Sequence, residues 1–236
     1  DANYFAEILS EQDLKDVLKS ELIKQQNLLV LGGGTNLLLT KRPNAVVLKI
    51  RIPGISSIEE GDDIIVTAGA GVVWNDLVKY CVRNGFAGIE NLSLIPGTVG
   101  ASPIQNIGAY GVELKDVFKS CVAYEIATSQ KRVFNFEDCH FGYRDSVFKN
   151  ELKGRYIITS VSFRLSKSAK INTQYGAIQD ELNNKGIAVP TIADISNVVS
   201  EIRVAKLPDP STIGNAGSFF KNPVITRNEF EMVKSE

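Results

Sequence analysis

The alternation of apolar and polar residues predicts both helices and strands in the first fifty residues. Apolar residues recur at helical spacing after Ser10, and Asp13 stands where a capping box needs it, so a helix is expected to about Gln26. Short apolar runs at 28–31 and 45–50 are typical of buried strands. The glycine run between them leads into apolar residues rather than a helix, so the pattern is not the fingerprint of a classical dinucleotide-binding fold.

The middle of the chain is predicted to be rich in strands around one amphipathic helix. That helix covers 74–84, and Gly85 stands where a helix commonly ends. The predicted strands cover residues 63–68, 120–127, 132–136 and 156–165. One face of the last strand is expected to consist of Ile157, Val161, Phe163 and Leu165.

A domain boundary is predicted where the composition turns small and polar, near 166–170. Beyond it, helices are expected over 177–184 and from a Thr191 cap to about Lys206. The second helix has a core face of Ile195, Val198, Val199 and Ile202. These elements indicate an α+β fold, with one domain over 1–166 and a second over 167–236.

Charge and cysteine content narrow the classes of function. The formal net charge is −1, and no apolar run approaches the length of a membrane span, so neither nucleic acid nor membrane is an expected partner. Three scattered cysteines fit buried thiols in a reducing compartment, which predicts a cytoplasmic protein. His140 beside Cys139 is not expected to be a catalytic pair, because neighbours on a strand point to opposite faces.

The segment 95–111 is the strongest candidate for a ligand site. It holds four glycines, two prolines and no charged residue. Glycines allow a backbone to approach a ligand closely, and prolines stiffen the loop in advance. Such a loop suits a flat polar cofactor or a phosphate better than a metal, while the alternative is an ordinary buried connection.

A second glycine-rich segment, Gly32-Gly33-Gly34-Thr35-Asn36, lies about sixty residues earlier. Consecutive glycines can form a backbone nest that binds phosphate oxygens, although tight turns use glycine as well. Two such loops can clamp the two phosphates of one dinucleotide. The pair therefore favours a ligand site over two unrelated turns.

Three further segments carry polar side chains suited to chemistry. Arg144 beside Tyr143 can present a guanidinium clamp for a carboxylate or phosphate, or can belong to a surface turn with Asp145. Arg203 and Lys206 share one helix face and suit either a diphosphate or the helix dipole. Ser218 lies before two aromatics, where it can transfer a proton or cap a helix, but no second histidine exists for a hydrolytic triad.

Taken together, these segments resemble the UDP-N-acetylenolpyruvoylglucosamine reductase family. The resemblance is carried, in order, by GGGTN, IPGTVGASPIQNIGAYG, FGYRDSVFK, KLPDP and GNAGSFFKNP. It implies an FAD-binding domain of the vanillyl-alcohol-oxidase/PCMH type over 1–166 and an incomplete α+β substrate-binding domain over 167–236. It also implies a monomeric, NADPH-dependent flavoenzyme that makes UDP-N-acetylmuramate for peptidoglycan.

The resemblance also implies roles for individual residues. Arg144 would polarise the substrate carboxylate and stabilise an enolate-like intermediate, and Ser218 would donate the proton after hydride transfer from N5 of non-covalent FAD. Contacts to the UDP-sugar are implied for Tyr143, Tyr175, Arg203, Lys206 and Asn222, with no metal. Contacts to FAD are implied for Gly32, Gly33, Gly34, Thr35, Asn36, Pro96, Gly97, Gly100, Ala101, Ser102, Gln105, Asn106, Gly108, Ala109 and Ile158.

Two departures from the family pattern affect these expectations. Ala101 stands where many members carry a second serine, so it offers only its backbone amide. The family's catalytic glutamate belongs to a segment beyond Pro223, and Glu229, Glu231 and Glu236 do not match that segment. The resemblance therefore implies a fragment that is inactive or poorly folded by itself.

Two other classes of function compete with the reductase. An oxidase of the same flavin fold usually carries a covalent flavin link through His or Cys, and His140 lies outside both glycine-rich loops. A non-catalytic module that binds flavin or a nucleotide sugar fits a fragment. The visible absorption spectrum separates flavin-binding proteins from the rest.

Overall fold

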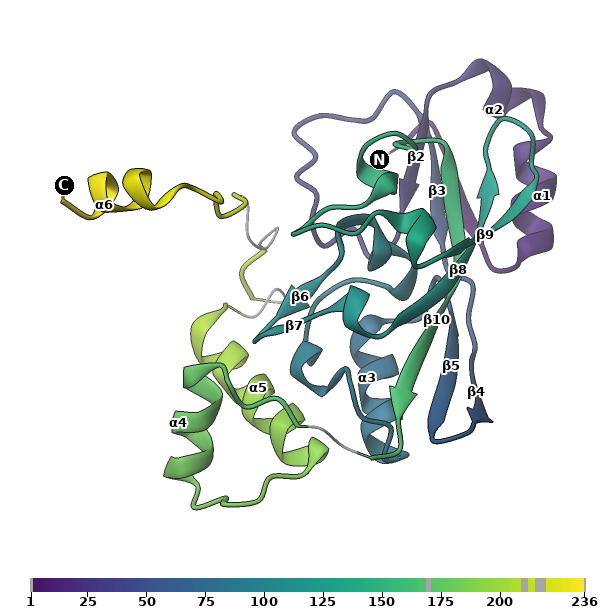
Figure 1. The fold of residues 1–236 in the computed structure, drawn as a ribbon. Helices are drawn as coiled ribbons and strands as arrows, with labels where there is room; N and C mark the ends of the chain where they lie inside the picture. The colour runs from purple at the N-terminus through teal and green to yellow at the C-terminus, as the bar shows by residue number, and fades with distance from the viewer. Residues whose placement is uncertain (1, 169–170, 209–211, 215–219, 236) are drawn as a thin grey trace.

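The computed structural model describes residues 2–168, 171–208, 212–214 and 220–235. It contains two larger β-sheets, a small two-stranded sheet and helices at both ends of the fold (Figure 1). The mixture of parallel and antiparallel strands with separate helices confirms the predicted α+β class.

The first sheet is parallel, with strand order β1-β3-β2. Its strands are β1 (Tyr4–Ile8), β2 (Leu28–Leu31) and β3 (Val46–Ile50), and the helices that connect β1 to β2 are α1 (Glu11–Leu18) and α2 (Glu21–Gln25). The single helix expected to Gln26 is therefore two helices. The chain leaves the helical path at Ser20, which has extended backbone dihedrals and begins α2.

The second sheet is antiparallel, with strand order β4-β5-β10-β8-β9. Its strands are β4 (Ile55–Glu60), β5 (Asp63–Gly69), β8 (Phe118–Glu125), β9 (Lys131–Asn135) and β10 (Tyr156–Ser166). The sequence did not predict β4, because this edge strand is mostly exposed and lacks the apolar alternation of its neighbours.

The predicted face of β10 is wrong at Ile157, because the strand contains a β-bulge at Thr159. The pairing of β10 with β8 shifts between Ile158 and Ser160, so the alternation of side chains reverses there. As a result, Ile157 belongs to the core beside the first sheet, while Ile158 and Val161 belong to the core on the other side of the second sheet.

The larger core lies between the second sheet and α3 (Trp74–Arg83). Trp74 is buried against Phe163, with ring centroids 5.8 Å apart, and its indole N–H donates to the Leu92 carbonyl. Gly85 follows α3 with a positive φ, as predicted. Short 3-10 turns between residues 90 and 105 then carry the chain through the predicted ligand loop to the hairpin β6 (Gly108–Ala109) and β7 (Val112–Glu113).

A third hydrophobic cluster holds α4 (Gly176–Asn184) against α5 (Ile192–Lys206). Thr191 caps α5 in a capping box with Asp194, and the predicted core face of α5 is buried. The Ser93 and Ser196 hydroxyls, 2.8 Å apart, join α5 to the larger core region. The last helix, α6 (Arg227–Ser235), has no buried residue and lies apart from the rest in Figure 1.

Cys139 and His140 do not lie on a strand, contrary to the expectation from the sequence. Cys139 ends a 3-10 turn and is buried, whereas His140 is exposed and adopts a left-handed backbone conformation. All three cysteines are buried and free. None of the helices in the part of the chain that the structure describes is long and apolar enough to cross a membrane.

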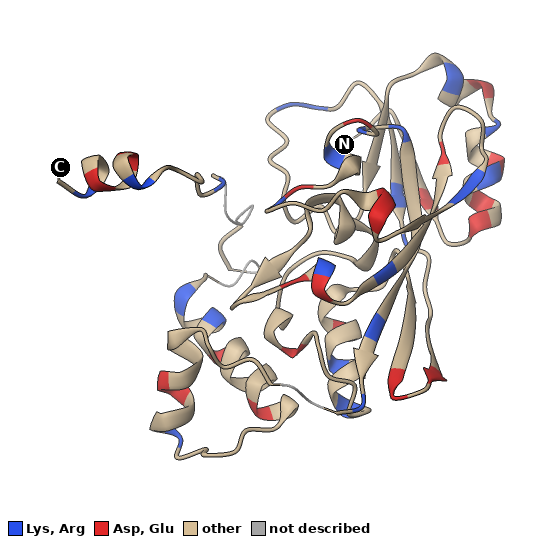
Figure 2. Ribbon diagram, in the orientation of Figure 1, with Lys and Arg blue, Asp and Glu red and all other residues tan. Residues whose placement is uncertain are grey.

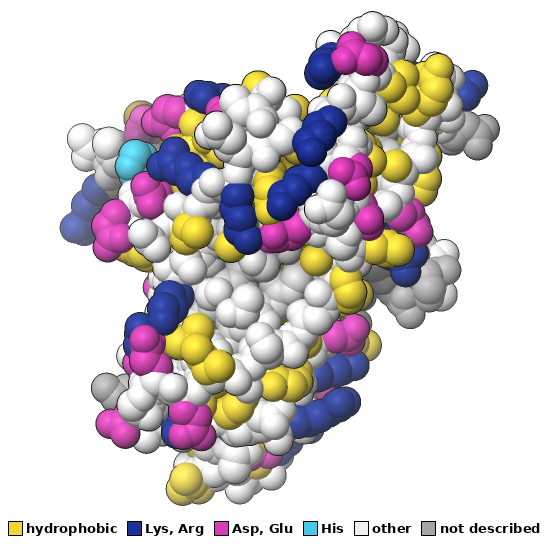
Figure 3. Space-filling view, turned by 90° about the vertical axis from the view of Figure 1, so that its right-hand side faces the viewer, with side chains coloured by type: hydrophobic (Ala, Val, Ile, Leu, Met, Phe, Trp, Pro, Cys, Tyr) yellow, Lys and Arg dark blue, Asp and Glu magenta, His cyan; other side chains and the backbone are white. Residues whose placement is uncertain are grey.

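Charged side chains of opposite sign are interleaved over the ribbon (Figure 2) and lie close together on the side that carries β4 and β5 (Figure 3). Glu11, at the start of α1, contacts three side chains of the second sheet. Its carboxylate accepts hydrogen bonds from Tyr124 at 2.7 Å, Lys131 at 3.0 Å and the bulge residue Thr159 at 3.0 Å. Glu11 therefore fastens α1 to the second sheet.

Glu11 is expected to make the stability of the fold depend on pH. Burial alone would raise the pKa of Glu11, but the hydrogen bonds from Tyr124, Lys131 and Thr159 outweigh burial and leave the pKa below its usual value. A lowered pKa means that the folded state favours the carboxylate, so its contribution is present at neutral pH and is lost as the pH falls through the folded-state pKa. We expect Glu11→Gln to lower the free energy of unfolding by about 1 kcal/mol at pH 7.

Urea unfolding of both proteins between pH 7 and pH 3 measures this effect. The difference between wild type and Glu11→Gln should narrow as the pH falls. Glu21→Gln, which removes an exposed partner of Lys24, is the matched control and should change little. A difference between Glu11→Gln and wild type that stays constant over the whole range would contradict the assignment.

Candidate functional site

The two glycine-rich loops predicted to share a ligand lie against each other. A Cβ built on Gly33 would stand 3.1 Å from the Cα of Gly97, and one on Gly32 would stand 2.4 Å from Thr98 Oγ1. Gly97 has a φ of +117°, which side chains rarely adopt. The two loops can therefore approach closely because residues 32 and 97 carry no side chain.

Two adjoining cavities follow the line where these loops meet. The smaller one, of about 270 Å³, is lined by 30–37 and by parts of the central loop from Pro96 to Ile107. The larger one, of about 540 Å³, continues past Gly32 and Thr98 to residues of 148–158. Volumes of this size are usual for small-molecule sites, and together the cavities form an extended cleft.

Thr98 provides evidence that the cleft takes a polar ligand. Its Oγ1 is buried and has no hydrogen-bond partner among the described residues, and Thr98 lines both cavities. A buried hydroxyl without a partner is costly, and a ligand oxygen in the cleft would satisfy it. Lys149 and Lys153 line the larger cavity and can balance the negative charge of a diphosphate.

Most of the residues expected to hold FAD line this cleft. Gly100 and Ile158 line the larger cavity. Gly32 and Ala101 line both cavities. The expected residues that line the smaller cavity alone are Gly33, Gly34, Thr35, Asn36, Pro96, Gly97, Ser102 and Gln105.

Asn106, Gly108 and Ala109 line neither cavity, and the first two contact Arg144 instead. Asn106 is fully buried with a φ of +43°. Its side chain donates to the Gly142 carbonyl at 2.9 Å and accepts from the Lys115 amide at 3.0 Å. The structure thus gives Asn106 contacts within the protein that organise the surroundings of Arg144.

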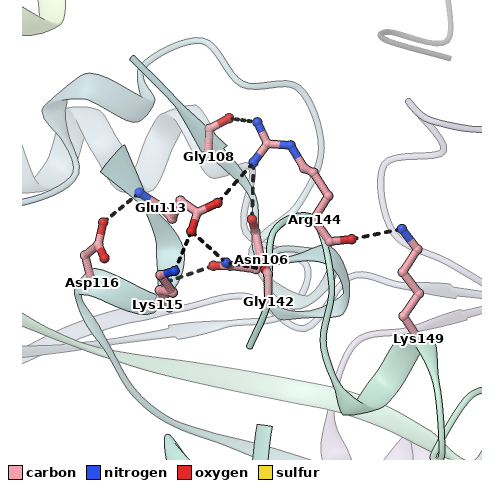
Figure 4. A network of polar contacts seen from close by, with 8 residues as sticks. All are labelled: Asn106, Gly108, Glu113, Lys115, Asp116, Gly142, Arg144 and Lys149. Atoms are coloured by element: carbon pink, nitrogen blue, oxygen red, sulfur yellow. Dashed lines mark hydrogen bonds and ion pairs between the residues drawn. The ribbon is translucent and has the colours of Figure 1, made fainter. Parts of the chain in front are cut away.

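Arg144 belongs to a tight turn in which Gly142 and Asp145 exchange backbone hydrogen bonds of 3.1 and 3.2 Å. Its guanidinium donates to the carbonyls of Asn106 and Gly108, as Figure 4 shows. These acceptors are neutral, so they hold the guanidinium without cancelling its charge. A fixed guanidinium of this kind can bind a carboxylate or stabilise negative charge that develops during a reaction.

A second basic side chain, Arg203, lies beside the β6–β7 hairpin. Tyr110 follows β6 and packs edge-on against Tyr175, with ring centroids 5.2 Å apart. Its hydroxyl lies near Arg203 at the end of α5, and the basic last turn of α5 faces the hairpin in Figure 2. Burial lowers the pKa of Arg203, and Arg203 Nε has no partner among the described residues. Arg203 therefore retains a buried donor for an acidic or polar ligand.

The other residues predicted to contact the substrate make fewer contacts or lie outside the described residues. Tyr143 is half-exposed, with the Arg144 guanidinium 5.3 Å and Lys221 Nζ 5.5 Å from its ring centre. Lys206 and Asn222 are exposed. Ser218, the expected proton donor, lies outside the described residues. The part of the chain that the structure describes contains no group of His, Cys, Asp and Glu that could hold a metal ion.

Comparison with known proteins decides the family. An FAD binding domain family model matches residues 2–136. The UDP-N-acetylenolpyruvoylglucosamine reductase of Flavobacterium johnsoniae is 48% identical over 98% of this chain and 69% of its own length. The chain belongs to this reductase family. A reductase of the same name from Pseudomonas savastanoi is 47% identical over 100% of this chain and 69% of its own length.

Solved structures agree with the predicted fold. A UDP-N-acetylenolpyruvylglucosamine reductase from Thermus caldophilus superposes with a TM-score of 0.65 at 23% identity, covering 93% of this chain and 68% of its own. A p-cresol methylhydroxylase superposes with a TM-score of 0.53 at 12% identity, covering 72% of this chain and 36% of its own. This chain therefore shares its fold with that reductase and with p-cresol methylhydroxylase.

Six residues of the site were not singled out by sequence reasoning: Thr98, Tyr110, Glu113, Lys115, Lys149 and Lys153. Thr98 and Tyr110 lie within the predicted loop, but nothing in the local sequence shows that one hydroxyl lacks a partner and the other reaches α5. Glu113 and Lys115 surround Arg144, and their positions depend on a 3-10 turn at 114–116 that a sequence pattern does not reveal. The spacing of Glu113 and Asp116, which fits a capping box, is the one available signal.

Proposed function

We propose that this protein is an FAD- and NADPH-dependent reductase that converts UDP-N-acetylenolpyruvoylglucosamine to UDP-N-acetylmuramate, a peptidoglycan precursor. The observation that carries the proposal is the cleft between Gly32–Asn36 and the central loop, in a chain of this reductase family. The unpartnered Thr98 hydroxyl and the closely packed glycines fit a cofactor with a polar backbone.

Bound FAD would supply the redox chemistry, taking a hydride from NADPH and passing it from N5 to the enolpyruvyl double bond. The chain contributes binding, orientation and charge. The two loops would hold the diphosphate and ribityl portions through backbone amides, with Lys149 or Lys153 balancing charge. Residues 1–166 would form the FAD domain and 167–236 part of the substrate domain.

Arg144 would bind the substrate carboxylate and stabilise the negative charge that develops when the double bond accepts a hydride. Tyr143, Tyr175, Arg203, Lys206 and Asn222 would contact the UDP-sugar. Arg203 is suited to an acidic group by its buried Nε. Tyr110 lies beside Arg203 and would help to orient it.

The cleft favours this proposal over the flavin-linked oxidase. Among the described residues, the lining of the two cavities contains neither His nor Cys, and the exposed His140 belongs to neither lining. Covalent attachment of flavin through histidine or cysteine therefore has no side chain to use among the described residues that line this cleft. The reductase proposal retains non-covalent FAD.

The absorption spectrum of the purified protein tests the flavin part of this proposal. Added FAD should be retained by the protein, released on denaturation and bleached by NADPH without oxygen. A colourless protein that takes up no FAD would exclude both the reductase and the oxidase. A protein that holds FAD and is not bleached by NADPH would be a flavin-binding module instead.

Ser218→Ala should separate the two halves of the reaction in the full-length protein. A positioned proton donor typically contributes a factor of about 10²–10⁴ to the rate. NADPH should still bleach the flavin at the wild-type rate, whereas reoxidation by the enolpyruvyl substrate should slow by about that factor. Stopped-flow absorbance measures both steps, and wild-type reoxidation would show that Ser218 is not the proton donor.

A further inference from the structure

We infer that Lys115 is a positioning residue that keeps Arg144 available to an acidic substrate by holding the carboxylate of Glu113 away from it. This inference rests on the proposed function, in which Arg144 binds the substrate carboxylate. Its evidence is the polar network of Figure 4, in which two basic side chains compete for one carboxylate.

Among the described residues, Glu113 is the acidic group that forms an ion pair with Arg144. The distance between the two charged groups is the longest at which an ion pair is counted. Arg144 Nη1 lies 4.0 Å from Glu113 Oε1, beyond hydrogen-bond distance. The Arg144 side chain is 32% exposed and that of Glu113 is 23% exposed, so the region is only partly screened by solvent. A small displacement of the carboxylate would form a close ion pair and neutralise the guanidinium.

Three donors hold the carboxylate away from Arg144. Lys115 Nζ lies 2.8 Å from Glu113 Oε2, and Asn106 Nδ2 lies 3.2 Å from the same oxygen. The Asp116 backbone amide donates to the Glu113 side chain in the capping box of the 3-10 turn. Lys115 supplies the only positive charge among these three, and Glu113 in turn raises the pKa of Lys115 through their hydrogen bond.

The guanidinium of Arg144 is held by neutral backbone carbonyls, and Lys149 binds only the backbone of Arg144. The carbonyls of Asn106 and Gly108 accept from its guanidinium, and its own carbonyl accepts from Lys149 at 3.0 Å. A guanidinium has five N–H donors, so these contacts leave donors for a ligand. Without Lys115, the nearest negative charge to occupy those donors would be Glu113 rather than the substrate.

The test measures substrate binding to the FAD-loaded protein rather than turnover. UDP-N-acetylenolpyruvoylglucosamine is titrated against oxidised enzyme, and the change in flavin absorbance gives its dissociation constant. Lys115→Met removes the cation while keeping a long side chain, and should weaken binding about tenfold. Adding Glu113→Gln to Lys115→Met removes the competing charge and should restore binding to within about threefold of wild type.

Lys119→Met is the matched control. Lys119 belongs to β8 and pairs with Glu60 on β4 at 3.0 Å, so its loss removes a lysine–glutamate pair that Arg144 does not share. Its dissociation constant should equal that of wild type. Thermal unfolding and FAD affinity are recorded for all variants to identify any that fold poorly, and Lys115→Ala replaces Lys115→Met if the latter does.

The outcomes distinguish this inference from the proposed function. Wild-type protein that holds FAD but neither binds nor reduces the UDP-sugar would contradict the proposed function. Wild-type protein that does both, with Lys115→Met unchanged or with no restoration in the double variant, would overturn the inference. Failure of restoration would mean that Lys115 contacts the substrate directly or only supports the fold.

Discussion

Gly32→Val is expected to weaken FAD binding strongly. Gly32 lines both cavities, and a Cβ at this position would stand 2.4 Å from Thr98 Oγ1, well inside contact distance. The added side chain must therefore push the loops apart or occupy the cleft. Overpacking typically costs about 1–3 kcal/mol, so we expect FAD affinity to fall by a factor of up to about 10².

Flavin fluorescence titration measures the loss of FAD binding, and circular dichroism confirms that the variant is folded. Gly176→Ala is the matched control, because no atom lies within 4 Å of a Cβ built at that position. Its FAD affinity should match that of wild type. An affinity of Gly32→Val within threefold of wild type would show that FAD does not lie in this cleft.

Arg144→Met is expected to lower turnover while leaving FAD binding unchanged. Arg144 lines neither cavity, but its guanidinium is fixed by the carbonyls of Asn106 and Gly108. Removing one fixed electrostatic group from an active site typically lowers kcat by about 10²–10³. Arg144→Lys keeps the charge but not the planar donor array, so it should recover only part of the loss.

Steady-state kinetics with NADPH and the UDP-sugar in the full-length protein measures the effect on kcat. FAD affinity serves as the internal control for correct folding of the cleft. A kcat within threefold of wild type in Arg144→Met would contradict the assignment. Loss of FAD from Arg144→Met would instead place Arg144 in the support of the cofactor site.

The sequence predicted those elements whose side-chain pattern is strong. α3 has a continuous apolar face and Gly85 at its end, and α5 has a capping box at Thr191. The elements that were missed or misread are weakly patterned. β4 is an exposed edge strand, and the helix expected to Gln26 is interrupted at Ser20 without a residue that forbids helix.

The site was predictable in composition but not in arrangement. Glycine content indicated that residues 32–36 and 95–111 hold a ligand, yet only the fold shows that Gly33 and Gly97 touch. The bulge at Thr159 reverses the side-chain alternation of β10, so Ile158 shares a core with Val161 rather than with Ile157. No local pattern shows that Lys115 and Arg144 share Glu113, because Arg144 lies about thirty residues away from Glu113 and Lys115 in the sequence.

Reoxidation of the reduced flavin tests the central claim most directly. The protein is loaded with FAD and reduced with one equivalent of NADPH in the absence of oxygen, and UDP-N-acetylenolpyruvoylglucosamine is then added. We predict that the oxidised flavin spectrum returns and that one equivalent of UDP-N-acetylmuramate forms. A flavin that stays reduced until oxygen is admitted, with no product, would contradict the account.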